Sequence, residues 1–380
     1  MALVLDEEQT MLAQTAGAFM RESSPISRFR ALRDSSEERG YSLDVYKQMA
    51  ELGWTAIPFS EADGGMGMGL AGLVIVTEAM GRGLAPEPLI PSIAMAGQAL
   101  SLAGSADQKS TWLAPAIEGE KVLALAYAER GQRYDLRDIA LGATDKDGGY
   151  ELSGEKTLVL GGQCADAFVV AARTAGKGGD ADGITLLLVP ADAAGVSTER
   201  QQRADCQNSA ILKLEGVKLG ADAVIGKAGE GHGVLCDVVD RATVALCGEM
   251  LGGMNEAFDR TLDYLKERKQ FDTVIGTFQA LKHRAARMYI ELELARSVVM
   301  AAARAIDDGA DNAKVLVSIA KAKLSDAYAL ITNEAVQMHG GIGMTDEHDI
   351  GFFMKRARGC EMTFGDAAYH RDRFASLSGY

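Results

Sequence analysis

The last third of the chain carries apolar residues at every third or fourth position, which is the spacing of one face of an α-helix. The clearest series lies between two others, one that starts after Asp240 and one that ends at Met338. Because amphipathic helices of this length must bury their apolar faces against one another, we expect a helical bundle. The members of the central series are Leu281, Ala285, Met288, Leu292, Ala295, Val299, Ala302 and Ile306.

A different pattern occupies the middle of the chain, where short β-branched or alternating runs are separated by turns rich in glycine and aspartate. AFVVAAR (167–173) and ITLLLVP (184–190), for example, flank the turn GKGGDADG (176–183). Alternation of this kind between such turns is typical of an antiparallel β-domain. We therefore expect no long helix across residues 167–219.

The first part of the chain has a helical pattern again. Asp6 precedes a run with two glutamates in its first turn, which is the chemistry of a helix start, and a glycine-rich loop follows at 58–69. The predicted fold class is thus α+β multidomain, with an N-terminal helical domain, a middle β-barrel-like domain and a C-terminal four-helix bundle. The expected bounds are 1–121, 122–228 and 229–380.

Composition narrows the classes of function. Of 380 residues, 47% are hydrophobic and 24% are charged, as in an ordinary globular protein, and the net charge of -14 disfavours binding to nucleic acid or an anionic membrane. Five cysteines without a C-x-x-C spacing and five scattered histidines predict reduced thiols and no metal site. An acidic N-terminus and the absence of a run of about 20 apolar residues predict a cytoplasmic protein without a signal peptide or membrane span.

Five local motifs, in order along the chain, resemble those of the acyl-CoA dehydrogenase family. The two most specific are YLKERKQF (264–271), similar to the family's Y-x-x-x-R-x-x-F signature, and QMHGGIG (337–343), similar to its Q-x-x-G-G-x-G signature. The other three are a first-domain loop (52–69), a central hairpin (150–173) and the turn GEGHG (229–233). Although the last has the glycine spacing of a dinucleotide loop, no βαβ pattern surrounds it, so a Rossmann site is rejected.

The resemblance implies that FAD is the cofactor and that this chain binds the ADP half of FAD seated in a neighbouring subunit. Arg268 would bind the pyrophosphate, because a guanidinium matches phosphate oxygens and stays charged. Each residue also has a simpler interpretation: a helix-end charge, a core aromatic side chain or a glycine helix cap. The residues implied for this half-site are Arg268, Gln270, Phe271, Gln337, Gly340 and Gly341.

Two segments depart from the family pattern where the flavin ring and the thioester would lie. The family's T-E-P-x-A-G-S-D stretch is replaced by AERGQRYD (128–135), without the threonine and the serine. The family's Lys-x-Trp-Ile-Thr is replaced by KTLVL (156–160), in which Leu158 and Leu160 stand for the aromatic ring and the hydroxyl. The resemblance therefore supports a flavin-ring site in this chain less well than an ADP half-site.

The catalytic base is the largest departure. Desaturation of an acyl-CoA thioester needs a carboxylate to remove the α-proton, and the family's usual glutamate would fall on Phe364 or Gly365. Three possibilities remain open: Asp366 as a shorter base, Glu249 on the first bundle helix, or no base in this chain. Asp366 also has the simpler interpretation of a helix-capping aspartate. Asp240 and Arg241 are the candidates for contacts with the substrate.

Three functions follow from these expectations. The first is the small subunit of a heteromeric acyl-CoA dehydrogenase, of the kind that oxidises steroid side chains or pimeloyl-CoA in bacteria. The second is a complete homomeric enzyme that uses Asp366, and the third is a scaffold or binding protein without redox chemistry. The resemblance implies an acyl-CoA substrate, a second dehydrogenase subunit in a dimer of dimers, and an electron-transfer flavoprotein as acceptor.

Overall fold

The computed structural model describes the chain except for residues 1–3, 36 and 147. The chain forms two compact units, each made of segments that are distant in sequence. The helical unit comprises residues 1–35, 70–85 and 243–380, and the mixed unit comprises 36–69 and 86–242. Within the described part, no helix is both long and apolar enough to cross a membrane.

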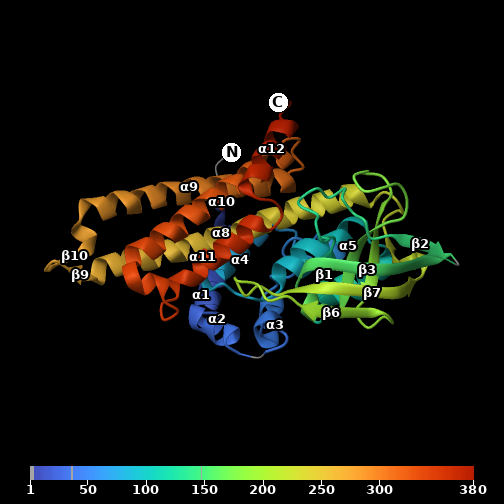
Figure 1. The fold of residues 1–380 in the computed structure, drawn as a ribbon, viewed down its shortest axis with the longest axis horizontal. Coiled ribbons are helices and arrows are strands. Elements are labelled where there is room, and N and C mark those ends of the chain that lie inside the picture. The colour runs from blue at the N-terminus through green and yellow to red at the C-terminus, as the bar shows by residue number, and fades with distance from the viewer. Residues whose placement is uncertain (1–3, 36, 147) are drawn as a thin grey trace. The chain divides into compact units, whose positions relative to one another are not determined.

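The helical unit contains the predicted bundle (Figure 1). In α9, Met288, Leu292, Ala295, Val299 and Ala302 of the predicted stripe are buried. The helices of this unit are α1 (Glu7–Ser23), α2 (Ile26–Arg33), α4 (Gly69–Gly83), the later part of α8 (Gly231–Glu267), α9 (Gln279–Asp307), α10 (Ala313–His339), α11 (Ile350–Met362) and α12 (Ala367–Leu377).

Polar contacts join the first helices of this unit to the last. Arg30 on α2 donates to the carboxylate of Asp349 at 2.7 Å, just before α11. The carboxylate of Asp307, at the end of α9, accepts the backbone N–H groups of Leu70 and Ala71 at 2.7 and 2.9 Å and so caps the start of α4. The predicted helix start at Asp6 is confirmed by a capping box on α1.

A short hairpin connects α8 to α9, at one end of both long helices in Figure 1. Strands β9 (Lys269–Gln270) and β10 (Thr273–Val274) pair antiparallel, and only Phe271 and Asp272 form the turn. Both turn residues have positive φ, 54° and 58°. A two-residue turn with this geometry normally contains asparagine and glycine, because other side chains are strained there.

The mixed unit holds two four-stranded sheets, in the orders β1-β4-β5-β8 and β2-β3-β7-β6. Apolar side chains from both sheets form one core, which includes Leu152, Phe168, Leu187 and Leu212. The strands are β1 (Leu123–Ala126), β2 (Ala143–Lys146), β3 (Gly149–Leu160), β4 (Ala167–Arg173), β5 (Ile184–Pro190), β6 (Val196–Arg200), β7 (Ser209–Leu219) and β8 (Val224–Ile225). The helices of this unit include α3 (Leu43–Glu51), α5 (Gln98–Ala103), α6 (Ala106–Gln108) and α7 (Ala114–Ile117).

The fold class is confirmed, and one detail of the sheet prediction is wrong. No α-helix occurs between residues 167 and 219, all of which the structure describes. The sheets are not wholly antiparallel, because β1 pairs parallel with β4, with Leu123 opposite Ala167. Periodicity could not reveal this pairing, since a buried strand has the same apolar sequence in either direction.

Candidate functional site

Arg268 follows the last residue of α8 and is exposed. Its backbone N–H donates to the Tyr264 carbonyl, and its carbonyl accepts from Ile275, both at 2.9 Å. Among the described residues, no hydrogen bond or ion pair holds its guanidinium. The backbone is therefore fixed, while the charged group remains available to an anion from outside this unit.

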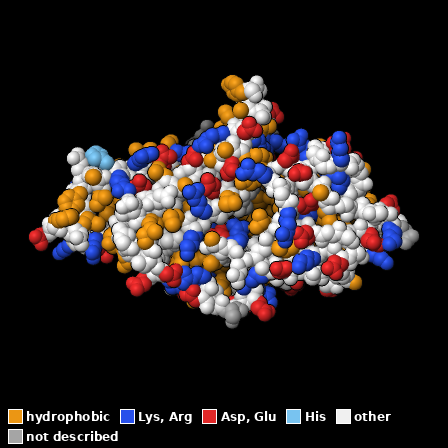
Figure 2. Space-filling model, viewed as in Figure 1, with side chains coloured by type: hydrophobic (Ala, Val, Ile, Leu, Met, Phe, Trp, Pro, Cys, Tyr) orange, Lys and Arg blue, Asp and Glu red, His pale blue; other side chains and the backbone are white. Residues whose placement is uncertain are grey.

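Phe271 is 86% exposed at the tip of the hairpin, where its ring forms a T-shaped pair with Phe278, with ring centroids 6.2 Å apart. Figure 2 shows hydrophobic side chains gathered at the end of the view where this hairpin lies. Gln270 is exposed on β9 beside Phe271. The expectation of a core position for Phe271 is wrong, because the tight turn points the ring away from the bundle. Strained, exposed residues of this kind are common where a protein contacts a ligand or partner.

The Gln337 side of the predicted half-site lies at the end of α10. Gln337, Gly340 and Gly341 are all exposed. Gly340 has φ of +67° and forms the helix cap, with its N–H donated to the Gln337 carbonyl. A Cβ on Gly340 or Gly341 would meet no atom within 4 Å. Packing within this chain therefore leaves open space in which a ligand could approach the backbone.

Stacked rings join these two groups of residues. The ring of His339, the last residue of α10, lies 4.5 Å from that of Tyr264 on α8, with an interplanar angle of 29°. Tyr264 is one helical turn before Arg268, and His339 directly precedes Gly340. The structure thus connects the predicted arginine and glycine groups, although they are about 70 residues apart in sequence.

The segment that would carry the catalytic glutamate holds a buried phenylalanine and a glycine, both with positive φ. Phe364 is buried with φ of +62°, and Gly365 has φ of +113°. A Cβ on Gly365 would lie 2.4 Å from the Tyr369 ring and 2.8 Å from His370 Nε2. Asp366 is the N-cap of α12 and accepts the Tyr369 N–H at 2.8 Å. The capping interpretation of Asp366 explains its position fully, and its role as a base stays a prediction.

Two buried cationic or basic side chains hold this segment in place. Lys321 on α10 donates to the carbonyls of Gly365 and Glu361 at 2.6 and 3.0 Å, and burial lowers its pKa. His370 Nε2 donates to the Phe364 carbonyl at 3.1 Å. Burial and, to a smaller extent, the charge of Lys321 lower the pKa of His370 to about 3. The charged stretch YHRDR (369–373) suggests a solvated surface for His370, but this interpretation is wrong, because His370 is 2% exposed.

Glu249 is unsuited to act as the base. Its carboxylate accepts from Arg356 Nη1 at 2.5 Å, and both side chains are buried. Moving this carboxylate to a substrate would leave the Arg356 charge buried without its partner, which is costly. Asp240 is buried and Arg241 is partly exposed on α8, so their proposed contacts with substrate stay a prediction.

The flavin-ring segments of the mixed unit contain a buried ion pair that the sequence analysis missed. Lys156 on β3 is fully buried and donates to Glu129 at 2.5 Å, and burial lowers the Lys156 pKa to about 8. Glu129 also accepts the N–H groups of Ala140 and Leu141 at 2.9 Å. Burial opposes ionisation of Glu129, but the charge of Lys156 and these hydrogen bonds together lower its pKa. The sequence signal for such an ion pair is a lysine at a strand position whose side chain faces the core, as at Lys156.

Further along β3, the backbone N–H of Leu158 already has a partner within the chain. Leu158 is 52% exposed with φ of +50°, and its N–H donates to the side-chain oxygen of Gln201 at 2.8 Å. Gln201 in turn donates to the Thr157 hydroxyl at 3.2 Å. The flavin-ring site of this chain therefore stays less well supported than the ADP half-site.

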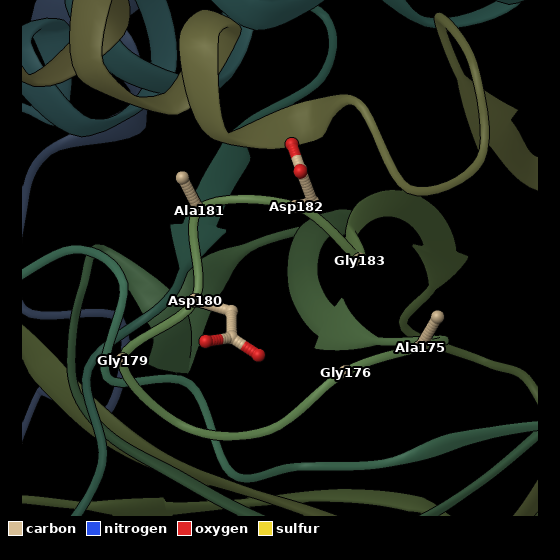
Figure 3. Close-up of a pocket in the computed structure, with 7 residues that line it drawn as sticks. All are labelled: Ala175, Gly176, Gly179, Asp180, Ala181, Asp182 and Gly183. Carbon is tan, nitrogen blue, oxygen red and sulfur yellow. The ribbon is translucent and has the colours of Figure 1, made fainter.

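An open hollow of about 400 Å³ lies within the loop between β4 and β5 (Figure 3). The Asp180 carboxylate points toward the inside of the loop, and the Asp182 side chain points away from it. The guanidinium of Arg173 donates to the carbonyls of both residues, at 3.1 and 3.0 Å. No group of metal-ligating side chains occurs among the residues that the structure describes. The hollow is therefore a product of loop structure stabilised by Arg173.

Comparison with known proteins identifies the family. Models of the acyl-CoA dehydrogenase N-terminal, middle and C-terminal domains match residues 6–120, 124–213 and 229–377. The chain is 31% identical over 325 residues to the caffeyl-CoA reductase-Etf complex subunit CarC of Acetobacterium woodii, covering 83% of this chain and 85% of that protein. The chain belongs to the acyl-CoA dehydrogenase family.

Two solved structures resemble the chain over nearly its full length. A chain of the ChsE4-ChsE5 complex from Mycobacterium tuberculosis has a TM-score of 0.89, 26% identity and full coverage of both chains. A variant of the Tcur3481-Tcur3483 steroid ACAD has a TM-score of 0.86, 30% identity and 98% coverage of both chains. The family uses FAD, so the cofactor predicted from the sequence is confirmed, and an oxidoreductase activity fits the family.

Proposed function

We propose that this chain is the small subunit of a heteromeric acyl-CoA dehydrogenase and supplies the ADP half-site for FAD held by its partner. The observation that carries the proposal is a contrast within one unit. The usual glutamate position falls on buried Phe364 or on Gly365, which has no space for a Cβ, whereas Arg268 and Phe271 are exposed at the hairpin. In this proposal the chain supplies the half-site, and its partner supplies the base.

The proposed chemistry divides between two chains. FAD, when bound, would supply the hydride acceptor for desaturation of the acyl thioester, and a carboxylate of the partner would remove the α-proton. In this chain, Arg268 would neutralise the pyrophosphate, Phe271 would contact the adenine, and the Gly340–Gly341 backbone would allow close approach. The bound groups would lie outside this chain's own core, as the exposure of these residues requires.

The comparisons support a two-protein assembly and a bulky substrate. One similar structure is described as a complex of ChsE4 with ChsE5, and the other as a steroid ACAD named for two proteins. We accordingly propose a polycyclic or similarly bulky acyl-CoA substrate and an electron-transfer flavoprotein as acceptor. The domain bounds 1–121, 122–228 and 229–380 remain our prediction.

The second candidate is a homomeric enzyme with Asp366 as base. In this candidate, Asp366 Oδ1 would keep the capping hydrogen bond from the Tyr369 N–H, and Oδ2 would remove the α-proton. Co-expression tests both functions: the chain is purified alone and with a dehydrogenase partner, and flavin absorbance and oligomer mass are recorded. We expect a colourless chain alone and a yellow hetero-oligomer with the partner. A yellow, active homomer would contradict the small-subunit proposal.

Arg268→Ala tests the half-site in the assembled oligomer. Loss of a charge-assisted hydrogen bond costs about 1.5–3 kcal/mol, which corresponds to a roughly ten- to hundredfold weaker affinity for FAD. Lys266→Ala is the matched control, because Lys266 is an exposed cation at the same helix end, paired only with Asp263 among the ion pairs found. Equal FAD affinities of the two variants would show that Arg268 is only a helix-end charge.

A further inference from the structure

The ring stack at the end of α10 joins three segments of the helical unit. The ring centroid of His339 lies 4.5 Å from that of Tyr264 on α8 and 4.5 Å from that of His348, which precedes α11. His339 is 3% exposed. Its ring therefore acts as a fixed spacer between helix ends that approach one another from distant parts of the sequence.

The stack is next to each part of the proposed half-site. Gly340 and Gly341 follow His339 directly, so the orientation of its ring and the path of the turn are coupled through one backbone segment. On the other side, the Tyr264 carbonyl accepts the Arg268 N–H at 2.9 Å. A change in the spacing of the two rings would therefore change the distance between the arginine and the glycine turn.

The stack is built for a neutral imidazole. The 2.7 Å contact of Nδ1 with the Ala335 carbonyl places the single ring proton on Nδ1, and the buried Nε2 has no hydrogen-bond partner among the described residues. A second proton would create a buried N–H without an acceptor, at a cost of about 1–3 kcal/mol. Protonation therefore opposes the stacked arrangement.

The charged groups around the stack do not offset that cost. Arg260 on α8 and Arg30 on α2 are cations near the two histidines, and both bind Asp349, at 3.6 and 2.7 Å. Burial, followed by His348 and Arg260, lowers the pKa of His339. Burial, Arg260 and Arg30 lower the pKa of His348, although Asp349 opposes this.

We propose that His339 is a positioning residue for FAD, whose neutral stacked ring holds the Gly340–Gly341 turn in register with the Arg268 end of α8. The inference rests on the proposed function, because it assumes that these groups bind the ADP half of FAD. Its consequence is that FAD affinity falls in acid, once the pH drops through the lowered pKa of His339 and the ring takes up a second proton.

The test uses the assembled flavoprotein and three forms of the chain: wild type, His339→Phe and His339→Ala. Phenylalanine keeps an aromatic ring but cannot take up a proton, and alanine removes the ring. FAD dissociation constants are measured at pH 7.5 and 5.5 from the fluorescence of free FAD, with far-UV circular dichroism to verify the fold. We expect wild-type affinity to be weaker at pH 5.5 than at pH 7.5, the Phe variant to be independent of pH, and the Ala variant to bind weakly at both pH values.

Two results would overturn the inference. One is a His339→Phe variant with the wild-type pH dependence, particularly if His348→Phe abolishes it, which would assign the titration to His348. The other is wild-type affinity in His339→Ala at pH 7.5. Failure of the proposed function appears separately, as unchanged FAD affinity in Arg268→Ala, which contains the intact stack.

Discussion

Acid should destabilise the helical unit through His370, and the magnitude follows from its surroundings. The folded state keeps this buried ring neutral, with a pKa of about 3 against an ordinary 6.5. Unfolding therefore takes up a proton at any pH between these values, so stability is complete above 6.5 and is lost as the pH falls. At pH 5 the difference is 1.5 pH units, which at about 1.4 kcal/mol per unit amounts to roughly 2 kcal/mol.

The variant His370→Gln isolates this contribution. Glutamine can donate a hydrogen bond toward the Phe364 carbonyl, as His370 Nε2 does, but it does not titrate. Its stability relative to wild type should therefore improve by about 2 kcal/mol between pH 7.5 and pH 5. His283→Gln is the control, because His283 is exposed on α9 and should show no such change.

Urea unfolding followed by far-UV circular dichroism measures the effect. Circular dichroism reports the helices, whereas the only two tryptophans, Trp54 and Trp112, both lie in the mixed unit and would report that unit. If the difference between wild type and His370→Gln is the same at both pH values, within about 0.5 kcal/mol, the ring is not held neutral and the reasoning fails.

Three further substitutions test the site and its supports. Gly341→Ala adds a methyl group in open space, at a residue without positive φ, so it should leave the fold unchanged. The same methyl group should weaken FAD binding in the assembled oligomer, and unaltered binding would exclude close approach of the cofactor. Gly365→Ala should lower the free energy of unfolding of the helical unit in urea by about 1–3 kcal/mol, because position 365 has a positive φ and an added Cβ would clash with the Tyr369 ring. A neutral effect would show that position 365 has room for a side chain. Glu129→Ala should cost the mixed unit about 3–5 kcal/mol, read by tryptophan fluorescence, by leaving Lys156 buried without its carboxylate. Adding Lys156→Met should recover most of that loss, and no recovery would show that the pair is not the cause.

The spacing of apolar residues was sufficient to predict the bundle helices. The burial of Met288, Leu292 and Val299 depends only on which face of α9 packs against its neighbours. The sequence also shows that residues 128–135 and 156–160 lack the hydroxyl and aromatic side chains that the family has at those positions. The ion pair of Glu249 with Arg356 was not, since 107 residues separate its partners and no spacing rule joins them. The same limit applies to the His339 stack, which exists only once α8 and α10 are packed.

The composition of the helical unit has a consequence for synthesis on the ribosome. Its first 35 residues and residues 70–85 pack with a segment that begins at residue 243. The contacts of Arg30 with Asp349 and of Asp307 with the start of α4 can form only after most of the chain has been made. The mixed unit is complete by residue 242, so it can fold first during elongation. The N-terminal helices must then wait with exposed apolar faces, which makes them the natural binding sites for chaperones on the nascent chain.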